Sequence, residues 1–78
     1  MSATLDELKG LMLSVGMDEA LVQGIDATRP LTQQGMDSVD YPAFALALEE
    51  RYGQTISDAD SLRLKTLDDF LAFVNGTD

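Results

Sequence analysis

The chain has 78 residues, with 14 acidic and 5 basic side chains and a formal net charge of −9, and it contains no histidine and no cysteine. A domain of this length buries a core worth only about 3–5 kcal/mol, so a large active-site cleft is not expected. No side chain titrates near neutral pH, and none can act as a thiol nucleophile or as a thiolate or imidazole metal ligand. The negative charge disfavours nucleic acid and anionic lipid and favours basic protein surfaces, although it also fits a plain requirement for solubility.

Apolar runs in the chain are short. The longest, Ala43–Leu48, is far too short to cross a bilayer, and Asp6, Glu7 and Lys9 argue against a signal peptide. Without cysteine there is no disulfide framework, so the fold must rest on apolar helix faces. We expect one cytoplasmic, monomeric, free-standing domain over residues 1–78, with no membrane span, no metal site and no catalytic residue.

A first helix is predicted from about Thr4 to Val15. Its apolar residues recur at three- and four-residue spacing, Thr4 with Glu7 forms a possible capping box, and Gly16 is a plausible stop.

A long connection then runs to Gly35. A short helical turn over Met17–Val22 is compatible with its sequence, and the residues expected to hold the connection against the core are Leu21, Ile25 and Leu31.

The second helix should run from Ser38 to about Tyr52. Phe44, Leu48 and Tyr52 follow one another at four-residue spacing, and Gly53 is the stop. Pro42 lies in the first turns, where its missing N–H costs little if Ser38 is the N-cap.

Two further helices are predicted from possible capping boxes. Ser57 with Asp60 predicts a brief third helix through Leu62, and Thr66 with Asp69 predicts a fourth, whose apolar residues follow i, i+3, i+4, i+7 spacing. No strand-like alternation is visible. The predicted fold is therefore an all-α, small antiparallel four-helix bundle with three main helices, one short helix and a long loop between the first two main helices.

The sequence does not support the familiar kinds of metal-binding or catalytic site. An EF-hand loop opening at Asp58 would place Arg63 where glycine is needed and Asp69 where a bidentate glutamate is usual. Neighbouring carboxylates such as Glu49 and Glu50 point to different faces of a helix, which favours a solvated surface over an acid–base pair. Ser38 has no histidine to activate it, so a serine hydrolase is the weakest hypothesis.

The segment from Gly35 to Val39 remains. Asp37 and Ser38 precede a predicted helix, and two such residues alone most often form just an N-cap. If the Ser38 hydroxyl has a further function, another molecule must use it as an attachment point.

Read outward from Ser38, the chain resembles the acyl carrier protein family, whose signature is Gly-x-Asp-Ser-Leu followed by a helix ending in Leu-Glu-x-x-Phe. Here these segments read Gly-Met-Asp-Ser-Val over residues 35–39 and Leu-Glu-Glu-Arg-Tyr over residues 48–52. The similarity extends upstream to Pro30, Leu31 and Thr32, and downstream through Ile56–Asp58 and Thr66–Asp69 to Phe73 and Val74. Residues 1–28 match only in helix position and length.

The resemblance implies that Ser38 carries a 4′-phosphopantetheine arm, transferred from coenzyme A by a phosphopantetheinyl transferase, and that Asp37 takes part in recognition by that enzyme. The arm's thiol would hold an acyl or aminoacyl group as a thioester. Further partners would be an acyl- or aminoacyl-loading ligase and downstream transferases or synthases with basic docking surfaces. The chain itself would not be an enzyme.

The same resemblance assigns roles to other residues on and after the second helix. Partner contacts would involve Val39, Asp40, Tyr41, Glu49 and Glu50, and an acyl cleft would be lined by Leu46 and Leu64. Each has a plainer alternative: ordinary surface for Val39, a solvated face for the glutamates, and core for the two leucines.

Four residues depart from the family pattern: Val39, Tyr41, Pro42 and Ala43. These departures favour a carrier for a specialised lipid, polyketide or aminoacyl pathway over general fatty acid synthesis. The alternative from another class is an unmodified acidic helical module for protein–protein interaction.

Overall fold

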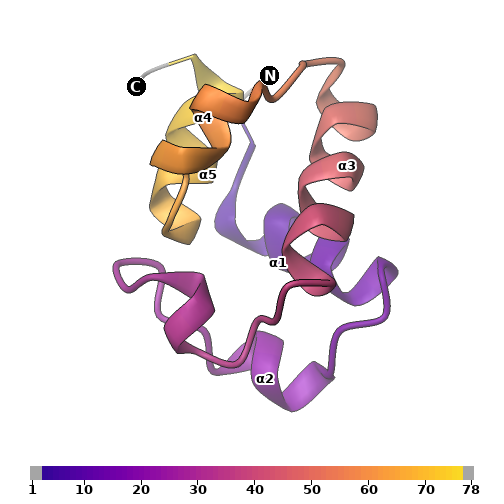
Figure 1. Cartoon of the computed structure of the whole chain (residues 1–78). Helices are drawn as coiled ribbons and strands as arrows, with labels where there is room; N and C mark the ends of the chain where they lie inside the picture. Colours follow the sequence, from indigo (N-terminus) through magenta and orange to yellow (C-terminus); the bar gives the residue numbers. More distant parts are fainter. Residues whose placement is uncertain (1–2, 77–78) are drawn as a thin grey trace.

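The computed structural model describes residues 3–76, which form five α-helices and one short 3₁₀ helix (Figure 1). In chain order they are α1 (Leu5–Ser14), α2 (Glu19–Gln23), η1 (Leu31–Gln33), α3 (Asp40–Tyr52), α4 (Asp58–Arg63) and α5 (Leu67–Asn75). Helix α1 contacts α2, α3 and α5. The four predicted helices are present, and the long connection adds α2 and η1 to them.

Local capping fixes the starts of α1, α4 and α5. The Thr4 hydroxyl accepts a hydrogen bond from the Glu7 N–H at 3.2 Å and begins α1, which ends one residue before the predicted Val15. The predicted capping boxes of Ser57 with Asp60 and of Thr66 with Asp69 are both confirmed. These starts were predictable because a cap needs only residues within one turn of each other.

Helix α3 begins later than predicted. Its first residue is Asp40 and not Ser38, while Tyr52 and the left-handed Gly53 end it as expected. Pro42 is then the third residue of the helix, within the first turn, where backbone N–H groups have few intrahelical acceptors. The later start therefore explains how this helix accommodates a proline.

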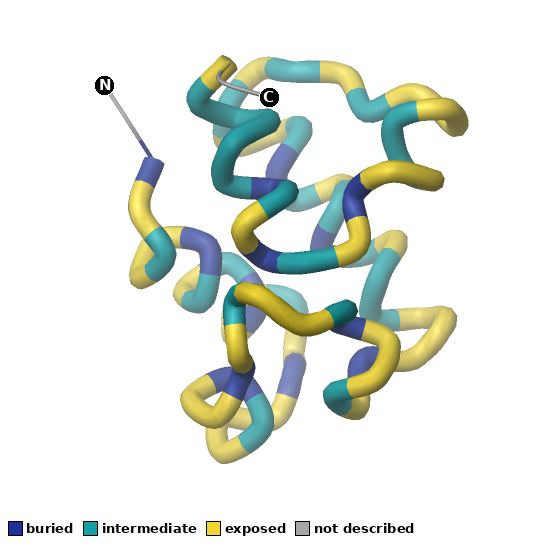
Figure 2. Tube along the Cα trace, turned by 90° about the vertical axis from the view of Figure 1, so that its left-hand side faces the viewer, coloured by how far each residue is buried: buried dark blue, intermediate teal, exposed yellow. Residues whose placement is uncertain are grey.

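The core lies where the inward faces of the helices meet. Phe44 of α3 and Phe70 of α5 are fully buried and stack edge to face, with their ring centroids 5.1 Å apart. Leu8 and Met12 of α1 are fully buried in the same cluster. Figure 2 shows buried positions recurring along the helices while most of the connecting bends are exposed.

The connection between α1 and α3 is tied to the segment before α5. Leu31 donates its N–H to the Lys65 carbonyl at 2.8 Å, and Asp68 donates its N–H to the Ala27 carbonyl at 3.0 Å. Ile25 and Leu31 are buried, as predicted, and Leu21 is half-buried against the same core. The connection is thus a packed part of the fold that runs directly to the turn before α3.

The two ends of the described chain also meet. Ala3 donates its N–H to the Asn75 side-chain oxygen at 2.7 Å, and the Asn75 amide donates back to the Ala3 carbonyl at 3.3 Å.

Over residues 3–76, none of the helices has both the length and the apolar character that crossing a membrane requires.

Candidate functional site

The turn that leads to Ser38 is shaped by Gly35 and anchored by Met36. Gly35 has a φ of +96°, a left-handed conformation that favours glycine, and Met36 inserts its side chain into the core. After this anchor the chain emerges, and Asp37, Ser38 and Val39 are all exposed. The turn therefore presents three successive residues at the surface immediately before α3.

Asp37, not Ser38, supplies the side-chain cap of α3. Its Oδ1 accepts hydrogen bonds from the Val39 N–H at 2.9 Å and the Asp40 N–H at 2.8 Å. These two hydrogen bonds, Asp40 first and then Val39, lower the pKa of the Asp37 carboxyl. Asp37 thus already occupies two of the backbone N–H groups that a helix start would otherwise offer to a phosphate.

The capping by Asp37 leaves the Ser38 hydroxyl available. Ser38 is exposed, and within residues 3–76 its hydroxyl has no hydrogen-bond partner. The Tyr41 N–H bonds to the Asp37 carbonyl at 3.2 Å, so Ser38 already lies within a helical turn. A substituent on its oxygen would point into solvent without displacing a structural contact.

The predicted partner residues differ in how free they are. Val39 is 74% exposed and Glu50 is exposed, whereas Asp40 is half-buried. Glu49 is also half-buried, and its carboxylate accepts a 2.6 Å hydrogen bond from the Ile56 N–H. The Glu49 carboxylate thus helps to hold the α3–α4 connection, while Glu50 has no such contact among the described residues.

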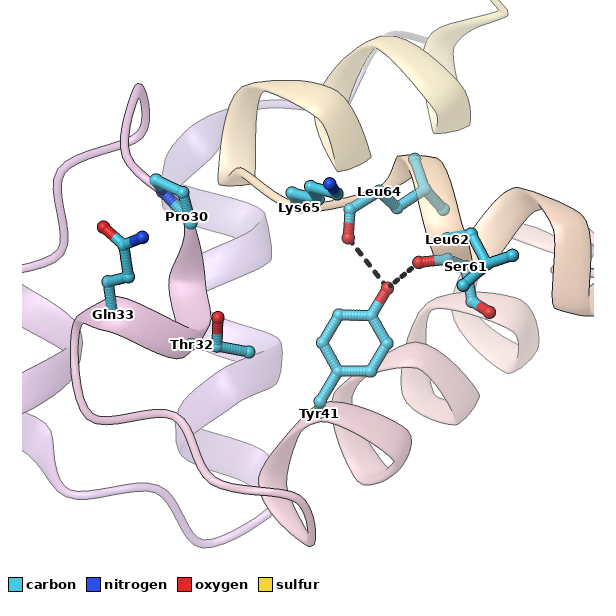
Figure 3. A pocket seen from close by; sticks show the side chains of 8 residues that line it. All are labelled: Pro30, Thr32, Gln33, Tyr41, Ser61, Leu62, Leu64 and Lys65. Carbon is cyan, nitrogen blue, oxygen red and sulfur yellow. Dashed lines mark hydrogen bonds between the residues drawn. The ribbon is translucent and has the colours of Figure 1, made fainter.

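Tyr41 lies on α3 with its hydroxyl turned towards α4. The hydroxyl lies 2.8 Å from the Leu64 carbonyl oxygen and 3.0 Å from the Ser61 carbonyl oxygen (Figure 3). Burial, followed by the nearby Asp69 charge, raises the pKa of the Tyr41 hydroxyl, so it remains a donor at neutral pH. With a single proton, it is shared between two carbonyls at the end of α4.

A groove of about 460 Å³ opens beside Tyr41. Figure 3 shows residues of the α1–α3 connection on one side of it and residues of α4 and the following segment on the other; its lining consists of Pro30, Thr32, Gln33, Tyr41, Ser61, Leu62, Leu64 and Lys65. A second groove, of about 290 Å³, lies between α3 and α4. Tyr41 and Ser61 line both grooves, so the hydrogen bond between them lies at their common boundary.

The two predicted cleft residues are not brought together. Leu46 is 56% exposed and lines the groove between α3 and α4, whereas Leu64 is only 3% exposed and lines the larger groove. The larger groove also contains residues that the sequence did not indicate, namely Thr32, Gln33 and Lys65. No local pattern marks them, because they become neighbours only when the connection packs against the end of α4.

The arrangement fits a polar group attached to Ser38. Ser38 lies one helical turn before Tyr41, and residues at this spacing have β-carbons about 5–6 Å apart. Tyr41 lines a groove that also contains hydroxyl, amide and ammonium groups from Thr32, Gln33 and Lys65. A flexible arm with amide groups could therefore lie along this surface while anchored at an otherwise unused hydroxyl.

A comparison with protein-family models agrees with this geometry. Residues 13–74, most of the chain, match the model of the PP-binding family, described as a phosphopantetheine attachment site. Members of this family carry covalently attached 4′-phosphopantetheine and are carriers without catalytic activity, which interact with phosphopantetheinyl transferases and biosynthetic enzymes. The chain belongs to the PP-binding family and is a phosphopantetheine carrier protein, not an enzyme.

Proposed function

We propose that Ser38 is the attachment residue and that the chain carries an acyl or aminoacyl group for a dedicated lipid, polyketide or aminoacyl pathway. The observation that carries the proposal is that the Ser38 hydroxyl is exposed and does not cap α3, because the Asp37 carboxylate is the cap. The arm supplies a thiol on which cargo is held as a thioester. This chain contains no cysteine or histidine, so the thiol of the thioester would come from the arm, and partner enzymes would form and cleave the thioester bond.

Attachment would use the Ser38 oxygen as the nucleophile. That oxygen forms the new bond to phosphorus, the bond from phosphorus to the adenosine bisphosphate part of coenzyme A breaks, and the hydroxyl proton passes to a base of the transferase. No hydrogen bond within residues 3–76 has to break for the Ser38 oxygen to react. Asp37 would hold the turn during this encounter and present its charge beside the nucleophile.

The exposed side of α3 supports docking by partner enzymes. Val39 and Leu46 are 74% and 56% exposed, and their seven-residue spacing places them on one side of the helix. Glu50 adds an acidic side chain to a protein whose net charge is already −9. Association with basic surfaces should therefore weaken as the salt concentration rises.

Intact mass after incubation with coenzyme A and a broad-specificity transferase tests the attachment. The wild-type chain should gain the mass of one phosphopantetheine arm, and Ser38→Ala should gain none. Ser14→Ala is a matched control because Ser14 is exposed but donates its hydroxyl to Leu11. An unchanged wild-type mass, under conditions that modify a control carrier, would instead support the unmodified interaction module.

Exchange with fatty acid synthase enzymes tests the dedicated pathway. We expect poor elongation of a fatty chain on this carrier, because Val39, Tyr41, Pro42 and Ala43 alter the start of the helix that those enzymes would contact. Efficient elongation would contradict that part of the proposal and leave the attachment at Ser38 intact.

A further inference from the structure

We propose that Tyr41 determines which cargo this carrier accepts: it closes the route from the surface into the helical core, so the carrier suits short or polar acyl groups that remain in the outer groove. This inference rests on attachment at Ser38. Its basis is the position of the Tyr41 ring and hydroxyl between the groove and the core.

The ring of Tyr41 covers the aromatic centre of the core. Its centroid lies 5.6 Å from that of Phe70, which in turn packs against the buried Phe44. An acyl chain moving inward from the groove would have to displace the Tyr41 ring before it reached these side chains. The interior is already filled at that point by two fully buried aromatic rings.

The hydroxyl of Tyr41 links α3 to the end of α4. It lies within 3.0 Å of two carbonyl oxygens, those of Ser61 and Leu64, which terminate a short helix and have few other donors available. Separating α3 from α4 would leave these carbonyls without this donor. The link therefore opposes the widening that a long chain would need.

The outer groove combines apolar walls, from Pro30, Leu62 and Leu64, with polar groups between them. Its volume of about 460 Å³ lies within the range of about 300–1,000 Å³ that is typical of small-molecule pockets. Thr32, Gln33 and Lys65 offer hydrogen-bond donors and one positive charge along its walls. Amide, hydroxyl or carboxylate groups of a short acyl chain find hydrogen-bond partners there, and its methylene groups can contact the apolar walls.

Thioester protection as a function of chain length tests the inference. Wild type and variants are loaded at Ser38 with acetyl or decanoyl phosphopantetheine from the matching coenzyme A thioesters, and cleavage by hydroxylamine is followed by intact mass. In the wild type the two thioesters should be cleaved at rates within about twofold of each other, because neither chain enters the core. In Tyr41→Ala the decanoyl thioester should be cleaved at least about fivefold more slowly than the acetyl thioester.

The other tyrosine of the chain provides a matched control. Tyr52 is also half-buried on α3, but its hydroxyl donates to Glu7 at 3.1 Å and it lines neither groove. Tyr52→Ala should therefore show no dependence on chain length. Tyr41→Phe keeps the ring and removes the link to α4, and we expect it to protect the decanoyl thioester less than Tyr41→Ala does.

The outcomes separate this inference from the proposed function. Wild-type protein that is not loaded at all contradicts attachment at Ser38. Wild-type protein that is loaded but already protects the decanoyl thioester overturns the role of Tyr41, and so does a folded Tyr41→Ala variant without protection. If Tyr41→Ala fails to fold, as judged by circular dichroism, Tyr41→Phe is compared with the wild type: greater protection of the decanoyl thioester supports the role of the Tyr41 hydroxyl link, and equal protection overturns it.

Discussion

Leu21 packs against the side of Gly35 from which a side chain would project. A β-carbon built on Gly35 would lie 2.6 Å from the Leu21 Cδ1 atom, and the φ of +96° at Gly35 would remain strained for any other residue. This contact joins the α2 segment to the turn that presents Ser38. Glycine is thus required at this position chiefly by its backbone conformation, because the Leu21 side chain can move aside.

We therefore expect Gly35→Ala to lower the free energy of unfolding by about 1–3 kcal/mol, chiefly because alanine is strained at this φ, since the Leu21 side chain can move. Urea unfolding measures the effect. Gly10→Ala is the control: Gly10 lies within α1 with open space around its β-position, so alanine there should stabilise the protein by about 0.5–1 kcal/mol. Equal effects at the two positions would refute the explanation.

The capping role of Asp37 and its proposed role in transferase recognition can be separated by substitution. Asp37→Asn should keep the cap on Val39 and Asp40 and leave the Tm nearly unchanged, because asparagine caps helices as well as aspartate does. Asp37→Ala should lower the Tm by several degrees. Both variants should be modified by the transferase severalfold more slowly if the charge is recognised, as initial rates from intact mass would show. If Asp37→Asn is modified at the wild-type rate, the transferase does not recognise the charge of Asp37.

The side chain of Gln34 forms three hydrogen bonds within the connection between α1 and α3. Its side-chain oxygen accepts from the Asp26 N–H at 2.7 Å, and its amide donates to the carbonyls of Asp26 and Arg29 at 2.9 and 3.0 Å. Gln34→Glu should lower the free energy of unfolding by about 1–2 kcal/mol, because the new carboxylate would face carbonyl oxygens.

Hydrogen exchange at the Asp26 amide should report the same loss as faster exchange. Gln33→Glu makes the identical change of charge one residue earlier, at an exposed position in the groove wall, and should have little effect on stability. If the free energy of unfolding falls equally in both variants, the cause is the added charge and not the loss of the Gln34 hydrogen bonds.

Glu49 and Glu50 should behave differently despite being neighbours. Glu49→Ala removes the acceptor of the half-buried Ile56 N–H and should lower the free energy of unfolding by about 1–2 kcal/mol. Glu50→Ala should change it by less than about 0.5 kcal/mol, because Glu50 is exposed. Thermal and urea unfolding of the two variants check this difference, and a Glu50→Ala variant as unstable as Glu49→Ala would contradict it.

Acid should destabilise the protein partly through Asp69. Burial raises the pKa of its carboxyl, but hydrogen bonds from Thr66 and Lys65 outweigh burial and hold the pKa below its ordinary value. The ionised carboxylate therefore stabilises the fold above the unfolded pKa of about 3.9, and this stabilisation is lost as the pH falls through the lower folded pKa.

Unfolding free energies measured between neutral pH and about pH 2 should decrease less steeply for Asp69→Asn than for the wild type. Asp68→Asn removes the same charge at the neighbouring exposed residue, and its pH profile should follow the wild type. An acid profile of Asp69→Asn as steep as that of the wild type would rule out this contribution.

Sequence by itself determined four of the helices and the position of Ser38 close to the start of α3. Thr4, Ser57 and Thr66 could be recognised as caps, and Gly53 as a stop, because each acts on backbone groups within one helical turn. The start of α3 was misplaced because Asp37 and Ser38 are both good capping residues, and the sequence does not show which side chain reaches the free N–H groups.

Only the tertiary structure decided how the site is lined. The family resemblance placed Tyr41 and Glu49 among partner contacts, but packing turns the Tyr41 hydroxyl towards Ser61 and Leu64 and directs the Glu49 carboxylate to Ile56. The groove itself joins the connection before α3 to the end of α4. Such pairings depend on how distant segments pack, and no periodicity within one helix encodes them.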